Sequence, residues 1–304
     1  MKKATVILTS ALALGLLAGC GNNTNNAPAA NATNAPAATT APAANATNAA
    51  NTGTETAKYQ DGTYYGTAEA DAKTGWQSFA MLTVEGGKIT KADWNAFNVK
   101  NAGDLKKKVS EDGKYGLVSK GGGQAEWHEQ AAKAEAFLIE KQDPAAITVN
   151  AEGKTDAISG VSVGVNDFVI AAQAALAAGP TQAGTLKDGG YHAEGAEFDK
   201  NNGFKSTVDL TVVNGNVVAA KFSGVNKDGV DKQQYSIDGK YGMKAGGAQA
   251  EWHEEIAKAQ AYYVENKATA PAMDAEGKTD AISGVSINVG EYFTLAEKAL
   301  EGAK

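Results

Sequence analysis

The chain repeats itself from Tyr59 onward, and this repeat limits its possible folds more than any other feature of the 304 residues. Residues 151–162 recur without change as residues 275–286, and residues 112–116 recur as 238–242. The offset between the copies falls slightly along the repeat, as expected where loops gain or lose single residues between fixed elements. Two units are too few to stack into a solenoid. The repeat therefore predicts a duplicated domain.

The repeat, and the composition of the chain before it, divide the sequence into five segments. We expect a signal peptide over residues 1–19, and a lipidated cysteine with a disordered Asn/Ala/Pro/Thr tether over residues 20–57. Two domains of about 120 residues follow, over residues 58–178 and 188–304, which is an ordinary domain size. A linker that contains glycine and proline, residues 179–187, joins them.

Each copy has the same expected order of elements, with strands first and helices after them. A glycine-containing turn joins two alternating strands, and Asn214-Gly215 in the second copy is a strong hairpin signal. Apolar residues at helical spacing then predict helices that begin at Trp127 and Trp252, and last helices over residues 167–178 and 291–302. The expected supporting i,i+4 pairs are Glu129 with Lys133 and Glu254 with Lys258. This order predicts the α+β class, each domain being an antiparallel sheet with flanking helices.

The first residues have the pattern of an export signal. Two lysines precede the apolar run of residues 4–17. The sequence Leu-Ala-Gly, which begins at Leu17, then leads directly to Cys20. The run is too short and too poorly flanked for a transmembrane helix. Its ending resembles the bacterial lipobox, which implies cleavage before Cys20 and a lipid anchor on its sulfur. The alternative is an ordinary secretory signal followed by an incidental cysteine.

Residues 21–57 are Asn, Ala, Pro and Thr almost throughout, and Glu55 is their only charged residue. Such a segment buries too little apolar surface to offset the entropy lost on ordering. We expect a flexible tether that lets the two domains sample a wide volume above the membrane.

The charge and the rare residue types exclude several functions. A net charge of −7 and a sequence pI near 5.1 argue against nucleic acid as a partner, because phosphate backbones need a basic face. All 28 cationic side chains are lysines, so the bidentate guanidinium grip on phosphates is missing. One cysteine and three histidines exclude disulfides, Cys-based zinc sites, Cys-ligated iron–sulfur clusters and c-type haem, and we expect no metal site.

The segment that is identical in the two copies carries the motif that indicates a function. It reads Asp-Ala-Ile-Ser-Gly-Val-Ser and ends at Ser162 and at Ser286. It resembles the acceptor motif of the FMN-binding domain family, Asp-x-x-Ser-Gly-Ala-Thr. In that family an ApbE-type flavin transferase takes FMN from FAD and esterifies the last hydroxyl. Here valine replaces alanine and serine replaces threonine, so the hydroxyl is kept while valine adds bulk.

The resemblance extends over residues 59–304 and implies two covalent FMN groups per chain, held by phosphoesters to Ser162 and Ser286. The other cofactor-binding positions that it implies are Asp156, Ser159 and Gly160 in the first copy and Asp280, Ser283 and Gly284 in the second. The protein is then a substrate of the transferase and an electron carrier, so no catalytic residue is expected.

The chemistry of the segment suits this role independently of the resemblance. Its small residues make a slim chain, and its glycine permits close backbone approach. The acceptor serine lies just before a helix, where free N–H groups and the helix dipole can hold a phosphate. The alternative is a strand-to-helix turn with a glycine that both copies need only for folding.

The layout of lipobox, tether and two such domains resembles the flavinylated electron-transfer lipoproteins of Gram-positive bacteria. This implies a carrier that is lipid-anchored on the extracellular face of the cell membrane. It would accept electrons from a membrane quinone/NADH dehydrogenase pathway and pass them to extracellular acceptors such as ferric iron, a task that suits a flavin. Two alternatives stay open: a lipoprotein that binds a small ligand without covalent flavin, and the source of a signalling peptide cut from the leader.

Two further features have both a functional and a structural interpretation. The tripeptide Trp-His-Glu begins a helix at Trp127 and again at Trp252. The tryptophan could stack on a flavin while His and Glu tune it. Large aromatic residues at helical spacing usually lie in the core, so we expect buried tryptophans, with His and Glu facing water. The run Lys106-Lys107-Lys108 is expected to be a solvated loop.

Overall fold

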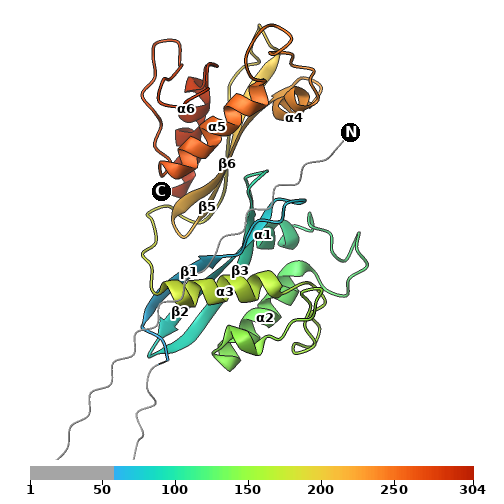
Figure 1. Cartoon of the computed structure of the whole chain (residues 1–304). Helices are drawn as coiled ribbons and strands as arrows, with labels where there is room; N and C mark the ends of the chain where they lie inside the picture. Colours follow the sequence, from blue (N-terminus) through green and yellow to red (C-terminus); the bar gives the residue numbers. More distant parts are fainter. Residues whose placement is uncertain (1–57) are drawn as a thin grey trace, which may run out of the picture. The chain divides into compact units, whose positions relative to one another are not determined.

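The computed structural model describes residues 58–304 (Figure 1). The predicted signal peptide, the lipidated Cys20 and the tether lie outside the described residues and stay predictions. Within residues 58–304, every helix falls short of the length and apolar character that crossing a membrane requires.

The first copy of the repeat forms an antiparallel sheet followed by helices. Its strands pair in the order β1-β2-β3, α3 packs on β1 and β2, and α2 packs on β3. The elements are β1 (Gly62–Thr67), β2 (Trp76–Glu85), β3 (Lys88–Asn98), α1 (Lys106–Glu111), α2 (Trp127–Lys141), the 3₁₀ helix η1 (Pro144–Ala146) and α3 (Asn166–Ala178).

The second copy repeats this order closely. Its strands pair in the order β4-β5-β6, α6 packs on β4 and β5, and α5 packs on β6. The elements are β4 (Gly189–Glu194), β5 (Phe204–Val213), β6 (Asn216–Asn226), α4 (Lys232–Ile237), α5 (Trp252–Glu265), α6 (Gly290–Ala299) and the 3₁₀ helix η2 (Leu300–Ala303).

The hairpin between the two long strands explains the Asp-Gly pair that opens each copy. Asn214 and Gly215 have φ values of 50° and 70°, as a two-residue hairpin turn requires. The Asp188 carboxylate accepts hydrogen bonds from both of their N–H groups, at 2.9 and 2.8 Å. Asp61 accepts from the Gly87 N–H at 2.8 Å in the equivalent turn, and bonding to this turn lowers the pKa of Asp61. The opening aspartate therefore ties the first strand to the hairpin.

Aromatic side chains fill the core of the first copy between its sheet and its helices. Trp94 of β3 contacts Trp127 of α2 and Phe168 of α3, with ring centroids 5.0 and 5.1 Å away. All three side chains are buried. Stacked and edge-on pairs of this kind stabilise a core beyond the area that they bury.

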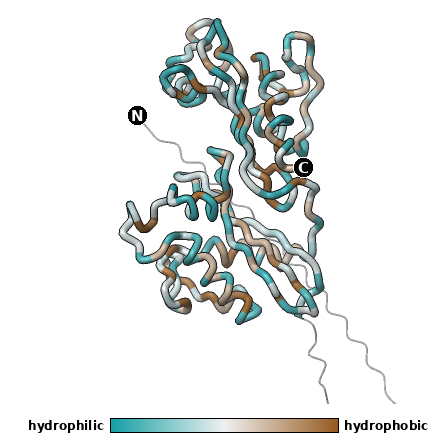
Figure 2. Tube along the Cα trace, turned by 180° about the vertical axis from the view of Figure 1, so that it is seen from behind, coloured by the Kyte–Doolittle hydropathy of each residue, from teal (hydrophilic) through white to brown (hydrophobic). Residues whose placement is uncertain are grey.

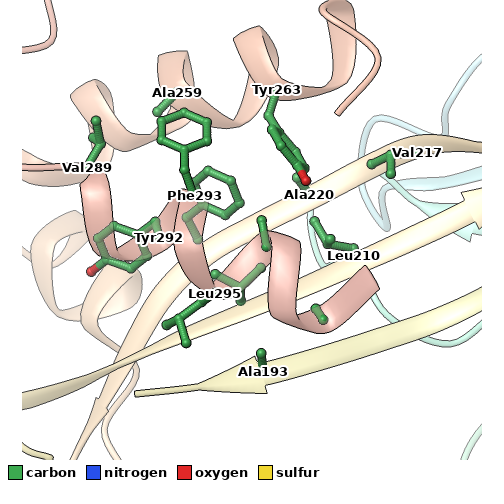
Figure 3. Close-up of a cluster of buried hydrophobic side chains, with 14 of the residues drawn as sticks. Ala193, Leu210, Val217, Ala220, Ala259, Tyr263, Val289, Tyr292, Phe293 and Leu295 are labelled. Carbon is green, nitrogen blue, oxygen red and sulfur yellow. The ribbon is translucent and has the colours of Figure 1, made fainter. Parts of the chain in front are cut away.

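Phe222 of β6 has the corresponding place in the second copy. Its ring centroid lies 5.5 Å from that of Phe293 and 5.8 Å from that of Tyr263. Figure 3 shows Tyr263 of α5 directed toward Ala220 of the sheet. The hydropathy of the chain alternates along its trace in both copies, as elements with one buried face require (Figure 2).

The predicted α+β class and the antiparallel sheets are confirmed. The helices begin at Trp127 and Trp252 as expected, and the last helices begin one residue earlier than expected, at Asn166 and Gly290. The final helix ends at Ala299 and continues as η2. The exact domain boundaries stay a prediction.

The expectation of a solvated loop at the three consecutive lysines is wrong. They form the first turn of α1, and α4 begins at the same position of the second copy. Lys107 pairs with Asp93 and, at 2.6 Å, with Glu135, while Lys108 pairs with Asp112. Lys106 points to the protein interior. A helix gives its successive residues different surroundings, which a run of identical residues conceals.

Candidate functional site

The motif forms an exposed loop before the last helix of each copy. In the first copy, Ile158 and Val161 are 7% and 8% exposed and anchor the loop to the core. The exposed members of the motif are Asp156, Ala157, Ser159, Gly160 and Ser162 in the first copy and Asp280, Ala281, Ser283, Gly284 and Ser286 in the second. The loops therefore present both predicted acceptor serines at the surface.

The glycine of the motif is required by its backbone and by its neighbour. Gly160 and Gly284 have φ values of +73° and +72°, where side chains are disfavoured. The amine of Lys133 donates to the Gly160 carbonyl at 3.3 Å, and that of Lys258 donates to the Gly284 carbonyl at 3.0 Å. A Cβ on either glycine would collide with the lysine amine. One lysine on the middle helix thus holds each loop.

These contacts replace two expected ion pairs. The sequence pattern predicts that Lys133 pairs with Glu129, but the Glu129 carboxylate accepts from the Glu126 N–H at 2.7 Å in a capping box. Glu254 does the same for Glu251, at 2.6 Å. Capping wins because the first N–H groups of a helix have no partner within the helix.

A buried glutamine holds the acceptor serine of the first copy. Gln130 of α2 is 1% exposed, and its Oε1 accepts from the Ser162 N–H at 2.7 Å and the Val163 N–H at 3.2 Å. The Ser162 hydroxyl donates to the same oxygen at 3.3 Å. The Gln130 Nε2 group donates to the Ala125 carbonyl at 3.0 Å.

A buried glutamate takes this place in the second copy. Glu255 of α5 is 3% exposed, and its Oε2 accepts from the Ser286 N–H at 2.5 Å and the Ile287 N–H at 3.1 Å. The Ser286 hydroxyl lies 3.1 Å from Oε1 and 3.0 Å from Oε2. The two acceptor serines therefore have chemically different partners.

The backbone N–H groups near the acceptors differ from the expectation that they are free. Those of Ser162 and Val163 bond to Gln130, as described above. At the start of α3, the N–H groups of Val165 and Asn166 donate to the Gly153 carbonyl at 2.7 and 3.2 Å. The second copy repeats this cap at α6 with the Gly277 carbonyl. In this conformation a phosphate on the serine needs a charge partner other than these amides.

A lysine enclosed by aromatic rings lies at the start of the short helix of each copy. In the second copy, the Lys232 amine is 4.5 Å from the ring centroid of Trp252, 5.2 Å from that of Tyr241 and 5.9 Å from that of Phe204. Burial lowers the Lys232 pKa to about 8, although the nearby Asp199 and Glu291 carboxylates raise it. We call these four residues, Lys232 with its three aromatic neighbours, the second-copy cage.

The first copy has the same arrangement. The Lys106 amine is 4.6 Å from the ring centroid of Trp127, 4.9 Å from that of Tyr115 and 5.7 Å from that of Trp76. These four residues form the first-copy cage. Burial lowers the Lys106 pKa to about 8, and the carboxylates that oppose this shift are Asp167 and Asp71. Each cage lysine thus has one carboxylate on the last helix and one between the first two strands.

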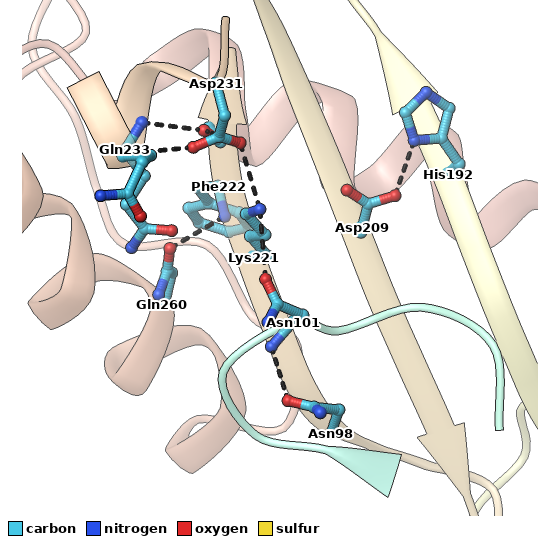
Figure 4. A network of polar contacts seen from close by, with 11 residues as sticks. Asn98, Asn101, His192, Asp209, Lys221, Phe222, Asp231, Gln233 and Gln260 are labelled. Carbon is cyan, nitrogen blue, oxygen red and sulfur yellow. Dashed lines mark hydrogen bonds and ion pairs between the residues drawn. The ribbon is translucent and has the colours of Figure 1, made fainter. Parts of the chain in front are cut away.

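The short helix that carries Lys232 is fixed to the sheet by its N-cap. The Asp231 carboxylate accepts from the Gln234 N–H at 2.9 Å, which caps α4. It also accepts from the Ser223 hydroxyl at 3.0 Å and pairs with Lys221 at 3.1 Å, both on β6 (Figure 4). These contacts hold the start of α4, and with it Lys232, at one position on the sheet.

A cavity lies beside the second-copy cage, and its lining includes residues that follow the acceptor loop in the chain. It has a volume of 210 Å³, and Lys232, Trp252 and Phe204 line it together with Asn288, Glu291 and Tyr292. Asn288 follows the acceptor Ser286 by two residues. A larger hollow of 780 Å³ shares Asp199, Asn202 and Phe204 with this cavity. The larger hollow lies within the roughly 300–1,000 Å³ of ordinary small-molecule sites, and the cavity beside Lys232 is smaller than that range.

The Trp-His-Glu tripeptides have mainly structural roles. Trp127 and Trp252 are 2% and 3% exposed, so the expectation of core tryptophans is confirmed. The histidines are half-buried and contact protein with one ring nitrogen: Nδ1 of His128 lies 2.9 Å from the Ser110 hydroxyl, and His253 contacts Ser236 in the same way, while Glu129 and Glu254 are exposed as expected. Both serines are 1% exposed, too buried to reach a substrate as nucleophiles. Among residues 58–304, no group of three His, Cys, Asp or Glu side chains could hold a metal ion.

The residue pattern of one copy alone predicts neither the cages nor the partners of the acceptor serines. The repeat itself contained the signal. Lys106 and Lys232 both stand six residues before the shared Asp-Gly-Lys-Tyr-Gly sequence, while the residues that follow them differ. Comparing the copies position by position would have separated this lysine from its neighbours.

Comparisons with known proteins give few matches. Neither the known protein families nor the curated proteins contain a match to the chain. A solution NMR structure of a Clostridium thermocellum protein is 48% identical, covering 39% of this chain and 91% of its own, with a TM-score of 0.32. A crystal structure of a Clostridium perfringens protein is 26% identical, covering 39% and 88%, with a TM-score of 0.30. Both come from a structural genomics programme, and their descriptions name no ligand or activity.

Proposed function

We propose that each copy carries a covalently attached FMN, bound through a phosphoester to Ser162 in the first copy and to Ser286 in the second. One observation carries the proposal. Each copy has an exposed serine at the same place on its motif loop, and this loop leads into a helix whose first turn holds a carboxylate near a lysine enclosed by aromatic rings. A turn kept only for folding does not require the lysine and its cage.

The residues around the second-copy cavity fit such a group. Trp252 and Phe204 lie mainly in the core, and the small parts of them that line the cavity are apolar and aromatic. Lys232 supplies positive charge for a phosphate or for an electron-rich ring, in a chain that has no arginine. Bound FMN supplies the redox chemistry, while these side chains bind it, orient it and set its electrostatic surroundings. Asn288 and Glu291 follow the acceptor Ser286 in the chain and line the cavity. They would therefore lie near the link between the serine and a group bound there.

We further propose that the chain is an electron carrier on the extracellular face of the cell membrane. The lipobox-like sequence before Cys20 supports the anchor. The motif loops support an ApbE-type flavin transferase as the partner that attaches FMN. A membrane quinone/NADH dehydrogenase pathway would then supply electrons, and acceptors such as ferric iron would receive them. A covalent bond prevents loss of the cofactor outside the cell.

The test is flavin attachment to the full chain. The protein is produced with and without an ApbE-type transferase, then denatured, and flavin fluorescence on the gel and intact mass are recorded. We expect two FMN additions with the transferase, one in Ser162→Ala or Ser286→Ala, and none in the double variant. Ser119→Ala, at an exposed serine outside the motif, is the matched control that keeps both additions. Flavin that persists in the double variant, or a wild-type chain that gains none, would overturn the proposal.

A small-ligand lipoprotein is the second candidate, and the cavity beside Lys232 is the observation that favours it. The same experiment separates the two. A ligand held only by the cavity is released on denaturation, whereas an ester-linked FMN stays with the chain.

A further inference from the structure

The two copies differ at the one side chain that contacts the acceptor hydroxyl. Gln130 and Glu255 stand at the same place in the repeat, three residues after Trp127 and Trp252. Both are buried, both lie on the middle helix, and both accept from the N–H groups of the acceptor serine and of the residue after it. The loop is therefore held alike in the two copies, and the difference between them is chemical.

Gln130 cannot take a proton from Ser162. A side-chain amide is not basic, and its two ends are already used in different ways. The Oε1 atom accepts from Ser162 and Val163, and the Nε2 group is turned away to the Ala125 carbonyl. Only one oxygen, at 3.3 Å, faces the Ser162 hydroxyl.

Glu255 presents both of its oxygens to the Ser286 hydroxyl, at 3.0 and 3.1 Å. Its partners at this loop are two N–H groups and one O–H group, all of them donors. An ionised carboxylate is the form that only accepts, so this set of partners suits the charged side chain. A carboxylate within hydrogen-bond distance of a hydroxyl has the geometry of a general base.

We infer that Glu255 is a general base for flavin attachment to Ser286 and that the first copy lacks this group. The inference rests on the proposed function. The Ser286 oxygen attacks the phosphorus on the riboflavin side of the FAD pyrophosphate, and the new O–P bond forms as the bridging P–O bond breaks. The hydroxyl proton passes to Glu255, and AMP leaves. No electrons are gained or lost.

Accepting the proton also removes a charge conflict. An ionised Glu255 would repel the phosphate that becomes attached beside it, and protonation leaves the carboxyl neutral as the ester forms. The amine of Lys258, bonded to the Gly284 carbonyl two residues before Ser286, adds positive charge to the same loop, and Lys133 does so in the first copy, so the two serines differ in the base and not in this charge. Ser286 therefore reacts faster than Ser162, although the two motifs are identical.

The experiment follows each serine separately in the full chain. Protein made without transferase is incubated with FAD and an ApbE-type transferase, and FMN addition is timed by intact mass. Ser162→Ala reports Ser286 alone, and Ser286→Ala reports Ser162 alone. In the first background, Glu255→Gln should slow attachment by about 10-fold, below the full effect of a general base because the transferase contributes as well. In the second, Gln130→Glu should speed attachment.

Each substitution introduces the residue that the other copy of the repeat has at this position. The loop therefore keeps an acceptor for its N–H groups. Thermal unfolding of the variants checks that the fold is retained. Equal rates for the two serines, with no change in Glu255→Gln and none in Gln130→Glu, would overturn the inference and leave the proposed function intact. Faster attachment in Glu255→Gln would overturn it as well, because charge repulsion would then dominate. A chain that gains no flavin at either serine would overturn both.

Discussion

The Lys232 amine lies 4.5 Å from the centre of the Trp252 indole ring. The lysine is 6% exposed, so its charge is largely removed from water. The cation–π contact and the Asp199 and Glu291 carboxylates offset only part of that cost, because the Lys232 pKa still falls to about 8. A buried charged side chain that is present in both copies despite this cost indicates a functional site beside it.

The lowered pKa makes stability depend on pH in a definite direction. The unfolded chain holds the Lys232 proton up to its ordinary pKa of 10.5, whereas the folded protein releases it near pH 8. Stability therefore rises with pH across this window, by about 3 kcal/mol at most for this lysine. Lys232→Met should remove the share of the rise that comes from this lysine and leave that of Lys106, and, because methionine suits an apolar cage, it should stabilise the flavin-free protein at pH 7 by about 1–3 kcal/mol.

Urea unfolding at pH 7 and at pH 9.5 measures this effect. The range stays below the titration of buried tyrosines such as Tyr292, whose pKa burial raises further. Lys298→Met, on the exposed side of α6, is the matched control and should leave the slope unchanged. An equally steep rise in Lys232→Met would contradict the assignment.

Replacing the motif glycine should strain the acceptor loop. Gly160→Ala places a Cβ at φ +73° and against the Lys133 amine, so we expect a loss of about 1 kcal/mol. We also expect slower flavin attachment to Ser162. Gly164→Ala is the matched control, because a Cβ there makes only an ordinary 3.7 Å contact with the Gly153 carbonyl. Similar unfolding free energies for the two variants would show that the loop tolerates the strain.

The hairpin of the second copy should depend on the opening aspartate. Asp188→Ala leaves the N–H groups of Asn214 and Gly215 without their carboxylate partner, and Asn214 is buried. A loss of about 1–3 kcal/mol follows from leaving buried donors unpaired. Chemical unfolding measures it, with the exposed Asp228→Ala as control. If both variants unfold at the same denaturant concentration, the two hydrogen bonds contribute nothing net.

The predicted anchor can be tested directly. Cys20→Ala should abolish lipid attachment, so the protein should stay unprocessed or leave the membrane fraction. Metabolic labelling with a fatty acid and fractionation of cells measure this. Unchanged retention in the membrane fraction would show that the lipobox resemblance is misleading.

The sequence alone determined much of the fold because its signals are local. Turn residues such as Asn214-Gly215 adopt positive φ values in almost any context, and the apolar spacing after Trp127 specifies one buried helix face. The glycine and the small residues around Ser162 likewise specify an exposed loop from their own neighbours. Because the sequence is repeated, the same elements form in both copies.

Only the tertiary structure decided which polar side chains are buried. Lys106 looks like its two neighbours in the sequence, yet it alone lies among rings supplied by Trp76 of β2, Tyr115 of a loop and Trp127 of α2. Gln130 contacts Ser162, which lies 32 positions later in the chain. Such contacts join segments that approach one another only when the helices pack on the sheet. The charge, pKa and reactivity of these groups depend on that packing, because burial and neighbours shift them away from what residue type alone gives.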